Sequence, residues 1–307
     1  MITSFFNKSK PVNFVIVFFI TLLAFLMARI YTDGDTISAS YIFKQAQLLF
    51  IAYASILLLN FIVAKHSLTK VNNYEILLFS LFFLTIVETT TSAKVLLSNF
   101  FILLAFRRII SVRSQRELKK KYFDAAFWVA IACLFYFWAI LFFILILASL
   151  ILYTENNIRH WIIPFLGVAT VFVISVGCSI LLYNNYFELL NNVMQVSFDF
   201  SSYNSVKFLV GITMLTSFGL WSLIFYIQNI KKKKKANRAS FKVVVLSVFV
   251  GFLLVILTPQ KNGSEFLFLF APLALVISNY IEILEDKWFK EIFVAVLFLV
   301  PFVILML

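Results

Sequence analysis

Two carboxylates, Asp33 and Asp35, flank a glycine in the segment "YTDGDT" at residues 31–36. A carboxylate can take a proton from an acceptor hydroxyl while neighbouring cations hold a phosphate, so the pair is a candidate reaction centre. Asp, Gly and Thr are also ordinary turn formers, and the segment fits a polar turn that caps the next helix. The segment alone leaves both interpretations open, a catalytic base or a structural turn.

Further charged residues flank two other short polar turns. Glu88 and Lys94 bound "VETTTSAK" at 87–94, and Lys261 and Glu265 bound the Asn-Gly turn "KNGSE" at 261–265. With Arg29, which precedes the Asp pair, these cations and acids form a predicted set of substrate-binding residues in which the cations meet phosphate oxygens. The alternative for each turn is a plain hairpin connection with snorkelling side chains at its ends.

Other sites for chemistry are missing. The sequence has no Gly-rich phosphate loop, nucleophile elbow or metal motif, so we expect no metal and no cofactor. His66 and His160 lie far from any acid pair with ligand spacing and are interpreted as interfacial residues. Cys133 and Cys178 lie inside apolar segments, where a thiol behaves as a small hydrophobe.

Composition assigns the chain to membranes. Hydrophobic residues make up 63% of the 307 residues and charged residues 13%, and the mean hydropathy is +1.00. Soluble domains have about 25% charged residues. The net charge of +12 raises the question of nucleic acid binding, but the positive charges are distributed by side of a bilayer rather than gathered on a folded surface. We therefore expect a membrane protein with no nucleic-acid partner.

Apolar runs long enough to cross a hydrocarbon core of about 30 Å predict an all-α, polytopic transmembrane bundle of about eleven spans. The run 123–153 is too long for one ordinary span, and we predict that it splits near Tyr136 into a helical hairpin. The other predicted spans are 11–28, 47–64, 74–89, 92–106, 161–183, 206–227, 241–258, 266–280 and 291–306.

The positive-inside rule orients these spans with the N-terminus inside and the C-terminus outside. Basic inside loops are predicted at 107–122 and 228–240, and larger outside loops at 29–46 and 184–205, within a single transmembrane domain over 1–307. The lysine run 231–235 is interpreted as topogenic charge that contacts anionic lipid, or alternatively as a docking site for a cytoplasmic partner. The cations that remain outside are Arg29, Lys44, Lys94, Lys207 and Lys261.

Three segments resemble the GT-C superfamily, the integral-membrane glycosyltransferases that use polyprenyl-phosphate sugars. They are the acidic loop "YTDGDT", the basic loop and hairpin at 99–152, and "KNGSEFLFLFAPLALVISNYI" at 261–281. The resemblance implies that Asp33 or Asp35 is the base and that Lys261 contacts phosphate. The sequence departs from the superfamily pattern, since Asp-Gly-Asp replaces Asp-Glu and Ser-Glu-Phe replaces the Arg-Tyr pair. The whole chain also resembles an uncharacterised bacterial integral-membrane family.

The leading hypothesis is a GT-C-like glycosyltransferase that uses a polyprenyl-phosphate-linked sugar at the outer face of a bacterial inner membrane. The first alternative is a non-catalytic scaffold subunit of an envelope assembly, with another membrane protein as its partner. A transporter or flippase is disfavoured, because the ionisable residues fall near span ends and the spans lack Gly and Pro breaks. Membrane lipids are expected partners in every case.

Overall fold

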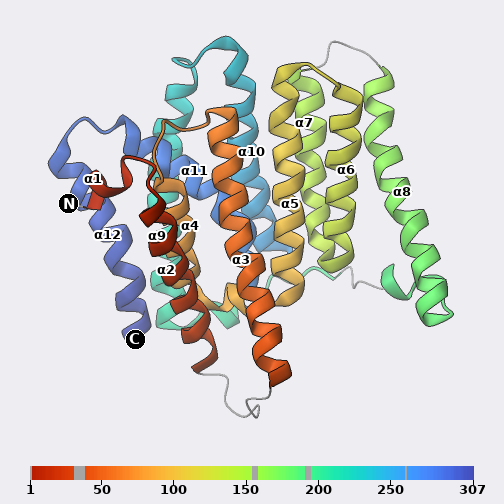
Figure 1. Cartoon of the computed structure of the whole chain (residues 1–307), viewed down its shortest axis with the longest axis horizontal. Coiled ribbons are helices and arrows are strands. Elements are labelled where there is room, and N and C mark those ends of the chain that lie inside the picture. Colours follow the sequence, from red (N-terminus) through yellow and green to blue (C-terminus); the bar gives the residue numbers. More distant parts are fainter. Residues whose placement is uncertain (1, 31–38, 154–157, 191–194, 260) are drawn as a thin grey trace. The chain divides into compact units, whose positions relative to one another are not determined.

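A computed structural model describes residues 2–30, 39–153, 158–190, 195–259 and 261–307. All regular elements in these residues are helices, which confirms the predicted all-α class (Figure 1). The α-helices are α1 (Ile2–Phe6), α2 (Pro11–Ile30), α3 (Ala39–His66), α4 (Tyr74–Thr85), α5 (Ala93–Ser111), α6 (Leu118–Phe135), α7 (Phe143–Tyr153), α8 (Ile158–Tyr183), α9 (Val206–Ile230), α10 (Lys235–Leu257), α11 (Leu267–Ile283) and α12 (Lys287–Met306).

Short 3-10 segments connect several of these helices. They are η1 (Val87–Thr90), η2 (Val112–Ser114), η3 (Phe137–Phe142), η4 (Glu188–Leu190), η5 (Ser201–Tyr203) and η6 (Ser264–Phe266).

Eight helical stretches of the described residues are long and apolar enough to cross a membrane, so the chain is a multi-pass membrane protein. They correspond to α2, α3, α5 with η2, α8, α9, α10, η6 with α11, and α12. The apolar α4 and the η3–α7 stretch are shorter. Several boundaries differ from the prediction by a few residues. The clearest case is α3, which begins at Ala39 rather than at 47 and so includes polar residues predicted to lie in a loop.

The break that divides the long apolar run 123–153 falls at Tyr136, as predicted. Helix α6 ends at Phe135, Tyr136 is extended with φ −146° and ψ 105°, and η3 begins at Phe137. The Tyr136 hydroxyl is hydrogen-bonded to the hydroxyl of Thr258 after α10. This bond anchors the extended residue, so the break is part of the packed structure rather than a fraying helix end.

The chain divides into two compact units. Helix α5 contributes its first residues to unit 1 and the rest to unit 2. Unit 1 comprises Met1–Leu96, Asp199–Lys232 and Gln260–Leu307, and unit 2 comprises Leu97–Phe198 and Lys233–Pro259.

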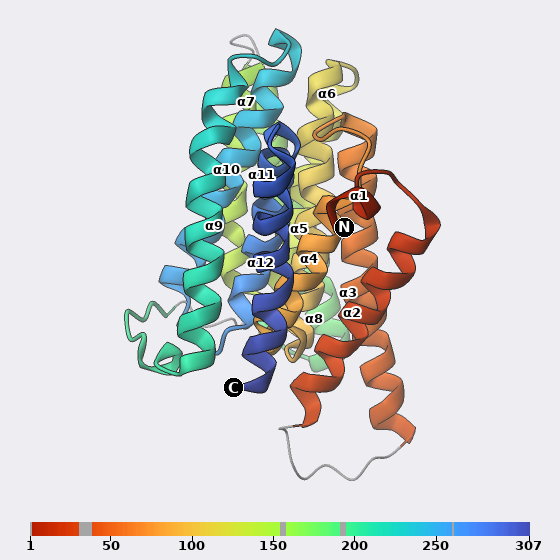
Figure 2. The ribbon, with the colours of Figure 1, turned by 90° about the vertical axis from the view of Figure 1, so that its left-hand side faces the viewer.

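Unit 1 is built around α4 and α11. Every residue of α4 is buried, as is α11 from Leu267 to Ile281, because α2, α3 and α12 pack on α4 and α9 packs on α11. Phe270 of α11 contacts the rings of Phe79, Phe82 and Phe83 on α4. Figure 2 shows α9 and α12 of this unit running antiparallel.

Unit 1 has two ends, each formed by a different set of helix termini. At the η1–η6 end, α2, α4 and α12 finish and α9 and α11 begin; at the α1 end, α2, α4 and α12 begin and α9 and α11 finish.

Unit 2 contains α6, α7, α8 and α10, and α8 packs closely along α6 (Figure 1). The contact depends on Gly167 of α8, because a Cβ atom there would lie 2.8 Å from the carbonyl oxygen of Phe123 in α6. An ion pair of 2.9 Å between Arg108 and Asp124 joins α5 to α6. Unit 2 thus depends on direct backbone approach as well as on side-chain packing.

Candidate functional site

The turn at 87–94 has a fixed conformation. Directly after α4, the hydroxyls of three successive threonines each donate a hydrogen bond to the carbonyl oxygen three residues earlier, at 2.6–2.9 Å. Such bonds compete with the helical ladder and so favour a turn over a longer helix. The threonine run therefore ends the helix at this point and holds the backbone that carries Glu88. The three are Thr89, Thr90 and Thr91.

Gly263 lets the turn at 261–265 pack directly on this segment. Its φ of +90° lies in the region that favours glycine, and an added Cβ would lie 2.6 Å from the Phe208 ring and 3.3 Å from Cβ of Glu88. The predicted Asn-Gly turn is thus a place of close approach between η6, η1 and the start of α9. Two polar turns that are far apart in sequence meet at the η1–η6 end.

A cavity of about 240 Å³ at this end is lined by one carboxyl group and one ammonium group, those of Glu88 in η1 and Lys207 in α9. Ser205 caps α9 by accepting a hydrogen bond from the Phe208 amide, which fixes the helical turn that carries Lys207. The remaining lining comes from α2, α4, α9 and α12: Met27, Leu84, Thr85, Val87, Phe208, Ile304 and Leu305. A carboxylate and an ammonium group therefore share a largely apolar cavity.

The environment of Glu88 suits a proton acceptor. Burial raises the pKa of its carboxyl, while the hydrogen bond from its own backbone amide and the charge of Lys207 lower it. Burial is the largest of these effects. A carboxyl with a raised pKa is a stronger base once ionised than an exposed glutamate, which is the property that general-base catalysis near neutral pH requires.

The predicted residues Lys261 and Glu265 are also brought together, but inside the protein. Glu265 is fully buried and accepts hydrogen bonds from the Tyr203 hydroxyl and, at 3.2 Å, from the Gly263 amide. The Lys261 ammonium lies 4.5 Å from the centroid of the Phe200 ring and is only 5% exposed. These contacts give the pair a structural role, the stabilisation of the loop before α9.

The charge of Lys261 is balanced by protein groups. Burial lowers the pKa of its ammonium, and the nearby carboxylates Glu265 and Asp199 raise it. The pKa of Asp199 is itself lowered, chiefly by hydrogen bonds from Ser201 and in addition by the charge of Lys261. Two acids near one lysine leave less positive potential for a phosphate here than in the Glu88 cavity, where Lys207 is the lining cation.

Arg29 makes hydrogen bonds within unit 1 that account for its position. Its guanidinium donates to the Gln45 side chain at 2.6 Å, to the Thr90 carbonyl at 3.1 Å and to the Phe25 carbonyl at 2.9 Å. These bonds tie α2, α3 and η1 together. Arg29 thereby supports the turn that carries Glu88.

Lys94 does not line the cavity. Lys94, at the start of α5, is exposed, and its side chain makes no hydrogen bond or ion pair within the described residues. Asp33 and Asp35 lie outside the described residues, so their assignment as catalytic acids stays a prediction.

Lys207 and Tyr203 were not among the predicted site residues. Lys207 was counted only as an outside cation, although a lysine one residue inside the apolar span 206–227 is a signal that the sequence contains. Nothing in the sequence pairs Tyr203 with Glu265, because that contact depends on the fold of the loop before α9.

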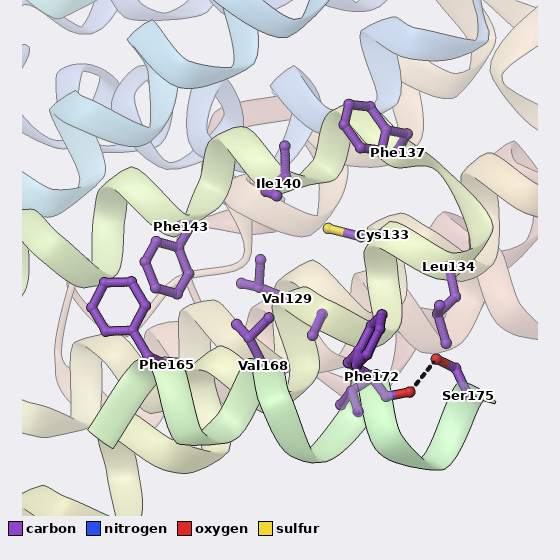
Figure 3. Close-up of a pocket in the computed structure, with 12 residues that line it drawn as sticks. Val129, Cys133, Leu134, Phe137, Ile140, Phe143, Phe165, Val168, Phe172 and Ser175 are labelled. Atoms are coloured by element: carbon purple, nitrogen blue, oxygen red, sulfur yellow. Dashed lines mark hydrogen bonds between the residues drawn. The ribbon is translucent and has the colours of Figure 1, made fainter. Parts of the chain in front are cut away.

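A second cavity, of about 420 Å³, lies in unit 2 between α6, η3, α7 and α8 (Figure 3). Its lining is almost entirely apolar, and the Ser175 hydroxyl donates to the Phe172 carbonyl at 2.8 Å. Cys133 supplies a thiol, but no charged group lines the cavity, so it offers no means to hold phosphate. The lining residues are Val129, Ala130, Cys133, Leu134, Phe137, Ile140, Phe143, Phe165, Val168, Val171, Phe172 and Ser175.

Comparison with known protein families gives one result. A family model with the description "Family of unknown function (DUF6427)" matches residues 5–307. The chain belongs to this family. The DUF6427 match covers both compact units and all of the candidate site residues. No curated protein and no solved structure matches the chain.

Proposed function

We propose that this DUF6427 protein is a membrane glycosyltransferase that takes its sugar from a polyprenyl phosphate and acts at the η1–η6 end of unit 1. The observation that carries the proposal is the cavity shared by Glu88 and Lys207. An ammonium group binds phosphate oxygens, and a partly buried carboxylate with a raised pKa accepts a proton. Both groups are needed for transfer of a sugar from a lipid phosphate.

Each residue has one role in this reaction. Lys207 binds the phosphate of the donor and stabilises the negative charge that develops on it. Glu88 takes the proton from a hydroxyl of the acceptor as that oxygen forms a bond to the anomeric carbon. The bond from that carbon to the phosphate oxygen breaks, and polyprenyl phosphate leaves with the electron pair. Asp33 and Asp35 are the competing candidates for the base.

The proposal includes a location and a topology. Eleven spans, with the N-terminus inside and the C-terminus outside a bacterial inner membrane, put the η1–η6 end at the outer face. The basic loops at 107–122 and 228–240 support this orientation through the positive-inside rule. Lipids and a polyprenyl-phosphate sugar are the proposed partners.

A non-catalytic scaffold subunit of an envelope assembly is the second candidate. The internal contacts of Arg29 and Lys261 favour it, because two of the predicted phosphate-binding cations are engaged with protein groups. A scaffold needs no functional carboxylate in the cavity. The two candidates therefore differ in what they require of Glu88.

The test is genetic. In a deletion strain complemented with wild type, Glu88→Gln, Lys207→Ala, Asp33→Asn or Asp35→Asn, protein level and the glycans of envelope polymers and secreted proteins are measured. Lys44→Ala and Glu188→Gln, which change exposed side chains, are the matched controls. The proposal expects loss of a glycan in Glu88→Gln and Lys207→Ala at normal protein level.

Other outcomes would change the assignment of the base or exclude the glycosyltransferase. Loss of the glycan only in an Asp33 or Asp35 variant would move the base to that residue. Normal glycans in all four variants, with a defect in the deletion strain, would favour the scaffold. No glycan defect in the deletion strain would exclude the glycosyltransferase.

A further inference from the structure

A second polar site lies at the α1 end of unit 1, where α4 begins. Glu75, in the first turn of α4, is 0% exposed, and neither of its carboxyl oxygens has a hydrogen-bond partner. Asn73, the residue before α4, is also 0% exposed, and both polar atoms of its side chain lack a partner. Four polar side-chain atoms are therefore enclosed together without a partner, although buried polar groups are nearly always hydrogen-bonded.

The helices around α4 enclose this site. Helices α2, α3, α11 and α12 pack on α4, and all of its residues are buried. Glu75 forms no ion pair within the described residues. An isolated ionised carboxylate in such surroundings is very costly, and proteins avoid the cost by keeping the group neutral or by binding a cation.

Glu282, near the end of α11, is the acid that acts on this site. Its charge reaches Glu75, and its carboxylate accepts hydrogen bonds from the Lys70 amide at 2.8 Å and the Asn72 side chain at 2.5 Å. The carbonyl oxygen of the same Asn72 side chain accepts from the Tyr74 amide at 3.2 Å. Glu282 is thus partly exposed and held by donors, while Glu75 is enclosed and has no donor from another residue.

Two neighbouring carboxyl groups in such different surroundings take different protonation states. Hydrogen-bond donors favour the ionised form of Glu282, and burial beside that negative charge favours the protonated form of Glu75. We propose that Glu75 is a proton-binding site of this protein and that the charge of Glu282 controls release of the proton. Ionisable residues enclosed in a membrane protein are commonly functional, and proton transfer is one of their main uses.

Other charged and titratable groups surround the pair. Lys290 interacts electrostatically with Glu282, Glu291 and Lys70. Tyr226 of α9 also interacts electrostatically with Glu282. Tyr74 donates a hydrogen bond to the Thr3 carbonyl at 2.7 Å.

A cavity of about 710 Å³ lies at this end of the unit and is the candidate entry for the proton. Tyr74, the residue before Glu75, lines it together with Lys287, Lys290 and Glu291. Polar groups and this volume admit water up to the residue next to Glu75.

The test is infrared difference spectroscopy of the purified full chain in lipid nanodiscs, titrated with pH in choline buffer. The expected result is a carbonyl band of a protonated carboxylic acid at neutral pH that is lost at high pH and is missing from Glu75→Gln. Glutamine mimics the neutral acid in shape, so this variant is expected to fold. In Glu282→Gln the band should remain, and its midpoint should shift to lower pH, because the negative charge of Glu282 no longer opposes ionisation of Glu75.

Glu188→Gln, which changes an exposed acid of unit 2, is the control and should leave the band unchanged. A titrating band that is the same in wild type and Glu75→Gln would overturn the proposal. So would a midpoint in Glu282→Gln that equals the wild-type value. Loss of the band when sodium replaces choline at constant pH would overturn the assignment to a proton, because sodium would then be the bound cation.

Discussion

Glu88 and Lys207 line the same cavity, although one lies in the turn after α4 and the other in the first turn of α9. Neither the threonine turn nor the helix cap depends on the other, and the close packing at Gly263 brings them together. The cavity therefore has a fixed carboxylate and a fixed cation before any ligand binds. Preorganised charges of this kind are what catalysis on a phosphate requires.

Coupling between these two groups predicts a pH-dependent stability difference. Burial raises the pKa of folded Glu88 above the unfolded value of about 4.3, so wild type loses stability relative to Glu88→Gln as pH rises from about 4 through the folded pKa. Lys207→Ala should enlarge this loss, because the lysine lowers the pKa of Glu88. Thermal unfolding of the three proteins from pH 4 to 9 measures these stability differences.

The double variant Glu88→Gln with Lys207→Ala is the control for this coupling. With the carboxylate removed, Lys207→Ala should have no pH-dependent effect that arises from Glu88. An equal effect of Lys207→Ala in both backgrounds would mean that the two groups do not interact.

Tyr203→Phe should destabilise unit 1. The buried Glu265 carboxylate would lose one of its donors, at a cost of about 2 kcal/mol, while the ring contacts of residue 203 with Phe208 and Phe266 are kept. Tyr186→Phe, at an exposed position, is the matched control. Denaturant or thermal unfolding in detergent compares them, and equal stability of the two variants would show that the Tyr203 bond contributes little.

Two glycines of α8 provide a matched pair in unit 2. Gly167→Ala would force a Cβ against the Phe123 carbonyl oxygen, whereas Gly177→Ala meets nothing within 4 Å. We expect Gly167→Ala to lower stability by about 1–3 kcal/mol through overpacking. Gly177→Ala should be neutral or slightly stabilising, since alanine is the better helix former. Similar stabilities would contradict the close packing of α6 and α8.

Much of the helical pattern was predictable, because length and hydropathy limit where helices can lie. The break at Tyr136 followed from the length of the apolar run and from charge on its two sides. The early start of α3 was not predictable from hydropathy, since its first residues include Lys44 and Gln45. Hydropathy marks where a helix enters an apolar layer and not where it begins.

The site was predictable only in part. Glu88 was identified from its polar turn, and Lys261 and Glu265 from theirs, but their division between an open cavity and a buried cluster depends on packing. Glu75 was not identified, because a carboxylate at the edge of an apolar run looks interfacial in sequence. Only the enclosure of α4 shows that it is buried.

Direct binding of polyprenyl phosphate by the purified full chain tests the central claim. Native mass spectrometry or a titration in nanodiscs would compare wild type with Lys207→Ala, Glu88→Gln and the exposed control Lys44→Ala. We predict that wild type binds saturably and that Lys207→Ala weakens the binding by at least about tenfold, which corresponds to about 1.4 kcal/mol. Glu88→Gln and Lys44→Ala should bind as wild type does. Equal binding by wild type and Lys207→Ala, or no saturable binding at all, would contradict the assignment of this cavity as the phosphate site.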